Sequence, residues 1–309
     1  MITLHVEPKQ APLSWLGFCA STPKFSIALD GYVADGPRVE RDRANFNHHE
    51  GCDRLATRST CAQALMAIRQ GLFRAFRNEA GPQCDVYVND CDEDVCLSWF
   101  LLRHHHWAGQ VMNPILNRLV AMEDALDSTA GAYPFPIDLP VLRELAWVFQ
   151  PYREFRVSGG LERKDAASYR SVIEDVEGRI GRHITGVGDE IALDTRYERM
   201  HMGDGWVMVR ELGAQARTAM LADGIQVYCS VRDRPLGGWT YTIGRLSPFV
   251  QFDLVELAER LNYEEELNSD LWGGGNTVIG SPRVTGSVLA PDMMQKFLDE
   301  HARRQRRST

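Results

Sequence analysis

Short apolar runs alternate with helix-like segments in the N-terminal part of the chain. Residues Phe25–Asp30 (FSIALD) and Asp85–Asp90 (DVYVND) are apolar runs that end in an acid, and they predict buried strands. Residues 58–76 and 95–105 place apolar side chains at helical spacing, which predicts two helices. Strand, polar loop and helix therefore recur in that order, and this favours an α/β fold with a mainly parallel sheet flanked by helices.

The pattern changes twice further along the chain. A helix predicted over residues 113–127 is followed by the breaker-rich stretch 128–140 (STAGAYPFPIDLP). Two helical patterns come next, around Val141–Phe149 and Ala166–Ile184, and after them short strand-like segments alternate with helices. We therefore predict a first α/β domain over residues 1–138, a helical connector over 139–200 and a smaller second α/β domain over 201–309.

Composition and charge narrow the class of protein. Hydrophobic residues make up 44% and charged residues 25% of 309 residues, which is enough to build a core and excludes general disorder. The net charge of -8 argues against long duplex DNA and anionic membranes as partners, and no apolar run could span a bilayer. The seven cysteines contain no C-x-x-C pair, and the N-terminus does not resemble a secretory signal. We expect a cytoplasmic protein.

The clearest chemical signal is an acidic cluster directly after the second predicted strand. Asp90, Asp92 and Asp94 occupy alternate positions, and in extended backbone such residues face the same side. Three converging carboxylates are costly unless a cation neutralises them, and their oxygens suit Mg²⁺ or Mn²⁺. Asp30, at the tip of the first predicted strand, is a further candidate of the same kind.

A second cluster, Asn47-His48-His49, precedes the first predicted helix. Adjacent histidines point in different directions, so one can bind a metal ion while the other hydrogen-bonds a ligand or a carboxylate. Mixed carboxylate and imidazole ligation favours Mn²⁺ over Mg²⁺.

These motifs resemble those of the DHH phosphoesterase superfamily, which includes RecJ-like nucleases, phosphodiesterases of small oligonucleotides and cyclic dinucleotides, and family II inorganic pyrophosphatases. The Asp-His-His motif corresponds to Asn47-His48-His49, followed by Arg58-Ser59-Thr60 at the start of a helix. The Asp-x-Asp motif corresponds to Asp92 and Asp94, with Asp90 giving the longer form.

The resemblance implies a site for two divalent ions, in which His48, His49 and Asp92 take part in catalysis and His49 contacts the scissile phosphate. It also implies a set of metal ligands. These are Asp30 at the strand tip, His48, the acidic cluster Asp90, Asp92 and Asp94, and one later helical acid, which is either Asp127 or Asp124.

The C-terminal part resembles the DHH-associated substrate-binding domain through a glycine triplet. Three glycines let backbone N–H groups approach an anion, and an arginine can bind a phosphate through two donors. The residues concerned are Gly273, Gly274, Gly275, Asn276 and Arg283.

Two departures from the family pattern bear on these expectations. The Asn-His-His cluster precedes the acidic cluster, whereas the family order is the reverse, so we expect a permuted catalytic domain. Asn47 replaces the first acid of Asp-His-His, and an amide cannot supply a negative ligand.

We therefore predict a hydrolase, dependent on Mn²⁺ or Mg²⁺, that cleaves a small phosphodiester or phosphoanhydride such as a short oligonucleotide or a cyclic dinucleotide. The sequence leaves a homodimer open. The alternative that Asn47 favours is a catalytically weak or inactive nucleotide-binding protein that retains the fold. A third reading is an α/β enzyme of another kind.

Overall fold

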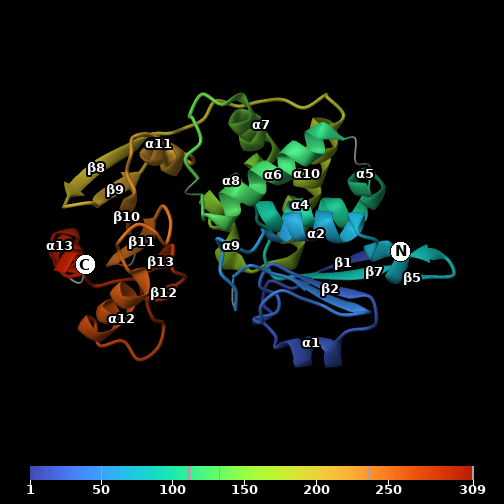
Figure 1. Ribbon diagram of the computed structural model, residues 1–309, viewed down its shortest axis with the longest axis horizontal. Coiled ribbons are helices and arrows are strands. Elements are labelled where there is room, and N and C mark those ends of the chain that lie inside the picture. The colour runs from blue at the N-terminus through green and yellow to red at the C-terminus, as the bar shows by residue number, and fades with distance from the viewer. Residues whose placement is uncertain (50, 110–112, 132, 235–236, 308–309) are drawn as a thin grey trace. The chain divides into compact units, whose positions relative to one another are not determined.

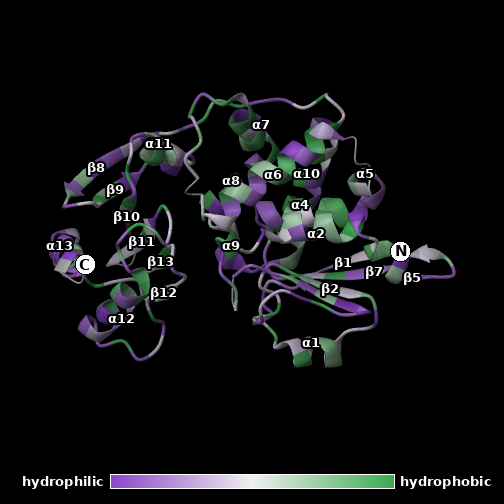
Figure 2. Cartoon of the chain, viewed as in Figure 1, coloured by the Kyte–Doolittle hydropathy of each residue, from purple (hydrophilic) through white to green (hydrophobic). Residues whose placement is uncertain are grey.

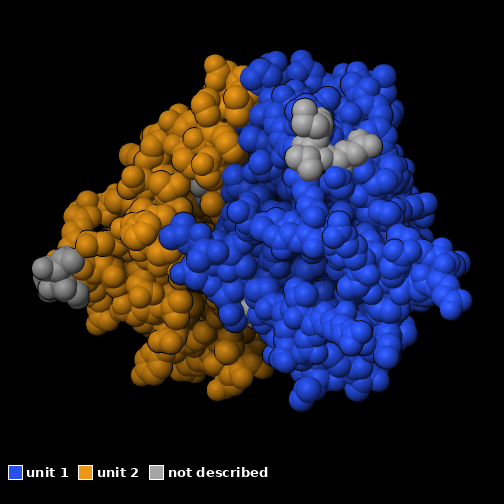
Figure 3. Space-filling model, turned by 45° about the vertical axis from the view of Figure 1, so that its right-hand side comes forward, with its two compact units in different colours: residues 1–128, 140–192 blue, residues 129–139, 193–309 orange. Residues whose placement is uncertain are grey.

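The computed structural model describes residues 1–49, 51–109, 113–131, 133–234 and 237–307. The chain forms two compact units (Figures 1 and 3). Unit 1 contains residues 1–128 and 140–192, and unit 2 contains residues 129–139 and 193–309. Both units combine helices with a sheet that contains parallel strands, so the predicted α/β class is confirmed.

Unit 1 is built on a five-stranded sheet in the order β1-β7-β2-β4-β3. The first four of these strands run parallel, and only β3 pairs antiparallel with its neighbour β4. The strands are β1 (Ile2–Val6), β2 (Ser26–Leu29), β3 (Arg38–Val39), β4 (Arg43–Phe46) and β7 (Cys84–Val88), and a separate small hairpin contains β5 (Arg77–Asn78) and β6 (Gly81–Pro82).

Helices cover both faces of this sheet (Figure 1). On one face, Trp15 and Phe18 of α1 pack against Ala28 and Tyr87 of the strands. On the opposite face, α2 and α4 contact the strands, and α10 packs against α4. The helices of unit 1 are α1 (Trp15–Ser21), α2 (Thr60–Arg69), α3 (Leu72–Ala75), α4 (Glu93–Arg103), α5 (His105–Gly109), α6 (Pro114–Ser128), α7 (Pro140–Val148), α8 (Gln150–Val157), α9 (Gly160–Arg163) and α10 (Ala166–Ile184).

Unit 2 is built on a six-stranded sheet in the order β12-β13-β11-β10-β9-β8, in which β9 and β10 are the parallel pair. Its C-terminal helix, α13, is mostly polar (Figure 2), but one side of α13 buries Met294, Leu298 and Ala302 in the core of the unit. Its elements are β8 (Tyr197–Met202), β9 (Val207–Glu211), β10 (Val227–Asp233), β11 (Trp239–Arg245), β12 (Gly273–Gly274), β13 (Val278–Gly280), α11 (Ala216–Ala222), α12 (Leu254–Glu264) and α13 (Pro291–Arg307).

The structure differs from the sequence-based expectations in two places. The helix predicted over residues 58–76 is two helices, because Gly71 takes a φ of +102° that ends α2 and starts α3. Residues 140–192, most of the predicted connector over 139–200, group with unit 1. The physical reason is that α10 buries Val172, Ile173 and Val176 on the face that packs against unit 1.

Among the described residues, none of the helices combines the length and the apolar character that a membrane crossing requires.

Candidate metal centre

The candidate site begins where two neighbouring parallel strands end. Strand β2 stops at Leu29 and β4 at Phe46, and these two residues are register partners. Asp30 and the turn Asn47–His49 therefore leave the sheet at the same edge. Asp30 has a φ of +49°, a left-handed conformation that residues other than glycine seldom adopt and that is often found at functional positions.

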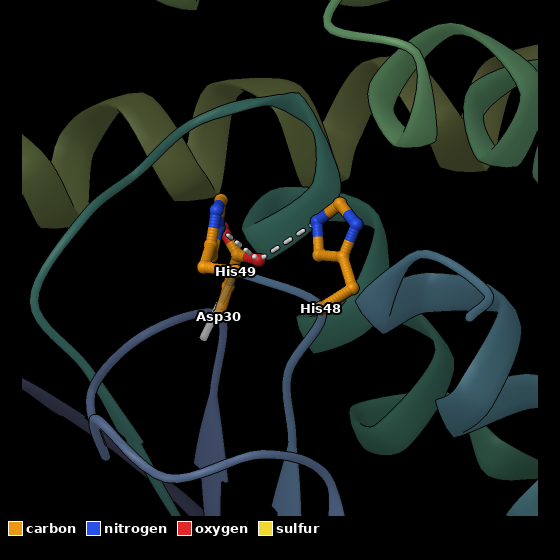
Figure 4. Close-up of side chains that lie close together, drawn as sticks. All are labelled: Asp30, His48 and His49. Carbon is orange, nitrogen blue, oxygen red and sulfur yellow. Dashed lines mark hydrogen bonds and ion pairs between the residues drawn. The ribbon is translucent and has the colours of Figure 1, made fainter. Parts of the chain in front are cut away.

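Both histidines turn their rings toward the carboxylate of Asp30 (Figure 4). The distance from Asp30 Oδ1 to His49 Nε2 is 2.9 Å, and that to His48 Nε2 is 3.4 Å. His48 is fully buried, whereas 32% of the His49 side chain is exposed. The three residues form a group whose ligand atoms lie close enough together to hold a metal ion.

A second group shares Asp30 and His48 with the first and adds two carboxylates from helices. Asp94 comes from the first turn of α4, and Asp127 comes from the end of α6. His48 Nε2 lies 2.7 Å from Asp127 Oδ2 and 3.8 Å from Asp94 Oδ2. The ligand atoms of these four residues all lie within 4.8 Å of one another, so this group too could hold a metal ion.

The hydrogen bonding of the buried atoms fits a cation. Both ring nitrogens of His48 and Oδ2 of Asp127 are buried, and apart from the ion-pair contacts of Nε2 with the surrounding carboxylates they have no hydrogen-bond partner among the described residues. Buried polar atoms are almost always hydrogen-bonded, so such atoms need an explanation. A divalent ion between them would satisfy the imidazole nitrogen and the carboxylate oxygen together.

The electrostatics of the group also favour a cation. Burial alone would lower the pKa of His48, but the carboxylates of Asp127 and Asp30 raise it to about 10. Burial, together with the charges of Asp127 and Asp30, raises the pKa of Asp94. Burial opposes ionisation of Asp30 as well, yet its contacts with His49 and His48 hold its pKa well below the usual range. The carboxylates thus repel one another, and a positive charge at His48 or a bound cation relieves that repulsion.

Asp94 also fixes the start of α2. Its two carboxylate oxygens accept the backbone N–H groups of Thr60 at 2.6 Å and Cys61 at 2.7 Å. The hydroxyl of Thr60 donates to Asp30 Oδ1 at 3.0 Å. The N-terminus of α2 therefore holds two of the candidate ligands in place.

Asp90 and Asp92 do not belong to either group of close ligand atoms. The expectation that Asp90, Asp92 and Asp94 share one face of extended backbone is wrong, because Asp92 is the N-cap of α4 and Asp94 lies inside that helix. Burial is the largest cause that raises the pKa of Asp92 and of Asp90. The negative charge of Asp30 also raises both pKa values. Both carboxylates thus lie near enough to Asp30 to feel its charge.

The structure distinguishes Asp124 and Asp127, the two acids of α6 that were alternative candidates for one metal ligand. Asp127 joins the cluster through His48, whereas Asp124 Oδ1 accepts the backbone N–H of Ser59 at 2.6 Å. Arg58 lies 3.8 Å from the other oxygen of Asp124. Asp124 thus supports the start of α2, and the grouped ligand atoms include Asp127 alone of the pair.

Asn47 has a structural role. Its amide nitrogen donates to the carbonyls of Asp35 at 2.9 Å and Val33 at 3.3 Å, and its Oδ1 accepts the backbone N–H of His49 at 3.0 Å. These bonds fasten the histidine turn to residues 33–35. The negative charge beside His48 comes instead from Asp30, on the neighbouring strand.

In unit 2 the glycine triplet forms a hairpin. Gly273 and Gly274 make up β12, and the N–H of Gly275 donates to the carbonyl of Val278 at 2.8 Å. All three glycines are exposed, and the carbonyl of Asn276 accepts the Nε–H of Arg245 at 2.6 Å. The carboxylate of Asp270 accepts the N–H groups of Arg283, Val284 and Thr285, an arrangement of donors that could otherwise bind an anion.

Sequence reasoning missed Arg54, whose guanidinium contacts His49 at the border of the cluster. An arginine five positions after a histidine matches no known motif, so its place beside His49 is visible only in the folded structure.

No protein-family model matches the sequence, and no curated protein is significantly similar to it.

Proposed function

We propose that the protein is a metal-dependent phosphoesterase, a permuted member of the DHH superfamily, that hydrolyses a small phosphodiester or phosphoanhydride. The observation that carries the proposal is the buried His48, whose Nε2 lies within 3.8 Å of three carboxylates that come from three different elements. An acid and imidazole donor set of this kind suits Mn²⁺ and, with more carboxylates, Mg²⁺.

Two ions would be held in adjacent positions. One position would use Asp30, His48, Asp94 and Asp127, whose ligand atoms all lie within 4.8 Å of one another. For the second position the family resemblance implies Asp90 and Asp92, which follow the same strand edge. Divalent ions bound there would lower the pKa of an attacking water and neutralise charge on the phosphoryl group.

The residues of the chain supply position and charge. Asp30 fixes His49 through the 2.9 Å contact, and Thr60 in turn fixes Asp30. The backbone N–H groups at the start of α2 hold the carboxylate of Asp94 in place, so this part of the site is organised before a substrate arrives. Unit 2 would act as the substrate-binding domain, through its exposed glycine hairpin and Arg283.

A net acidic surface favours a small phosphorylated substrate, such as a short oligonucleotide or a cyclic dinucleotide, over long duplex DNA. All seven cysteines are free thiols, which supports a reducing, cytoplasmic location.

The competing function, an inactive nucleotide-binding protein, draws its support from Asn47. That support weakens because the Asn47 amide is occupied with the carbonyls of residues 33 and 35, while Asp30 supplies the negative charge beside His48. A protein that only binds a nucleotide would have little use for so many buried carboxylates.

The test is hydrolysis of a panel of short oligonucleotides, cyclic dinucleotides, pyrophosphate and bis-(p-nitrophenyl) phosphate by the full chain with Mn²⁺. We expect turnover that a chelator and His48→Ala abolish and that Asp124→Asn largely retains. Absence of turnover on every substrate, combined with thermal stabilisation by a nucleotide, would support the binding protein instead.

A further inference from the structure

The loop that follows the histidine turn contains an arginine to which the proposed reaction gives no role. The carboxylate and carbonyl of Asp53 accept the N–H groups of Leu55, Ala56 and Thr57, so residues 53–57 have a defined shape. Within it, the half-buried Arg54 directs its guanidinium to the site: Nη2 contacts Nδ1 of His49, and Nη1 donates to the carbonyl of Asp127 at 3.3 Å.

Arg54 differs from the other arginine of this loop in its partners. Arg58 lies within ion-pair distance of Asp124, whereas Arg54 has no ion pair with a carboxylate in the part of the chain that the structure describes. A guanidinium at the edge of an acidic cluster would be expected to pair with an acid. Because Arg54 contacts an imidazole and a backbone carbonyl instead, its positive charge stays available to an incoming anion.

The same contacts limit what His49 can do. Its Nε2 lies 2.9 Å from Asp30, and its Nδ1 faces Arg54. A guanidinium can only donate, so Nδ1 accepts and Nε2 donates to Asp30. Both ring nitrogens are therefore engaged, whereas the guanidinium of Arg54 keeps further N–H donors that can bind a phosphate.

We propose that Arg54 binds a non-bridging oxygen of the substrate's phosphoryl group and that His49 is a positioning residue that holds the guanidinium. This proposal rests on the proposed function. In phosphoryl transfer, charge develops on the equatorial oxygens, and an arginine beside the metal ligands stabilises that charge. It replaces the direct contact between His49 and phosphate that the family resemblance implies.

The experiment measures two affinities of the full chain by calorimetry, first for Mn²⁺ and then for inorganic phosphate on the Mn²⁺-loaded protein. The variants are Arg54→Met, Arg54→Lys and, as the matched loop control, Arg58→Met. We expect unchanged Mn²⁺ affinity in all of them. Phosphate affinity should fall about 10- to 100-fold in Arg54→Met, less in Arg54→Lys, and less than about twofold in Arg58→Met.

A further variant, Arg54→Ala, tests the guanidinium itself. Added guanidinium ion at low concentration should restore part of its phosphate affinity, an effect that a merely structural role of Arg54 would not produce. Circular dichroism verifies that each variant is folded. If the neutral variants do not fold, the phosphate affinity of Arg54→Lys still tests the role of the guanidinium.

The outcomes separate the two proposals. Failure of the wild type to bind Mn²⁺ would overturn the metal centre and this assignment with it. Normal Mn²⁺ binding with wild-type phosphate affinity in Arg54→Met would overturn the role of Arg54 alone. An equal loss in Arg58→Met would also overturn it, because the charge of the loop, and no particular guanidinium, would then attract phosphate.

Discussion

The imidazole of His48 lies 2.7 Å from the carboxylate of Asp127, although one residue follows a strand and the other ends a helix. Apart from the ion-pair contacts within this cluster, His48 Nε2 and Asp127 Oδ2 have no hydrogen-bond partner among the described residues, and both face Asp30 and Asp94. This pair is the part of the structure that best fits a bound metal ion.

We expect Asp127→Asn to weaken Mn²⁺ binding about 10- to 100-fold, because an amide lacks the charge of the ligand that it replaces. Asp124→Asn is the matched control on the same helix, and it should leave the affinity close to that of the wild type, since Asp124 supports Ser59. Calorimetric titration of chelator-treated protein measures both. Equal affinity in Asp127→Asn and the wild type would remove Asp127 from the site.

Metal affinity should rise with pH. The pKa of His48 is raised to about 10 and those of Asp94 and Asp92 are also raised, so protons occupy ligands that the metal needs. Binding must displace those protons, and higher pH makes this easier. Titrations between pH 6.5 and 8.5, in buffers of different ionisation enthalpy, should show proton release. Affinity that is independent of pH would contradict this protonation scheme.

Asn47→Asp should destabilise the fold without improving metal binding. The new carboxylate would face the carbonyls of Asp35 and Val33 and lose the donor that both now accept. Losing these bonds costs about 1–3 kcal/mol of the free energy of unfolding. Urea denaturation measures this cost. Higher Mn²⁺ affinity at undiminished stability would mean that residue 47 is a ligand position after all.

The Glu177 side chain should stabilise unit 1 in a pH-dependent way. It accepts from Trp99 at 2.9 Å, Arg103 at 3.0 Å and His104 at 2.7 Å. Burial opposes ionisation, but these bonds hold the pKa of Glu177 below its ordinary value of 4.5. The stabilisation is thus present above that value and is lost as pH falls through the lower pKa of the folded state.

We expect Glu177→Gln to lower the free energy of unfolding by about 1 kcal/mol at pH 7 and to have less effect near pH 3. Glu174→Gln, on the exposed side of the same helix, is the control for the change in net charge. A Glu177→Gln deficit that stays constant across this range would show that ionisation of Glu177 contributes nothing.

One strand tip of the site could be predicted from the sequence. The apolar run that ends at Asp30 predicted its strand, whereas the parallel strand that ends just before Asn47 was not predicted, and the pairing of the two strands brings their tips together. Asp94 could be nominated, but only with the wrong geometry, because its alternate spacing suggested extended backbone where a helix begins.

Other features depend on contacts between distant segments. The pattern of α10 shows an apolar face over Val172, Ile173 and Val176 but does not tell which helix it packs against. The choice between Asp124 and Asp127 depends on how α6 is rotated toward α2 and His48. Arg54 had no local signal, since only the folded loop brings it to His49.

The division of the chain has a practical consequence for expression. Ser128 is the last residue of the first segment of unit 1, and residues 129–139 belong to unit 2, where the carbonyl of Ala130 accepts a bond from Arg217 at 3.2 Å. The polypeptide then re-enters unit 1 at Pro140. No single cut can therefore separate the two units cleanly, because a fragment 1–192 keeps the candidate metal centre but takes residues 129–139 away from unit 2.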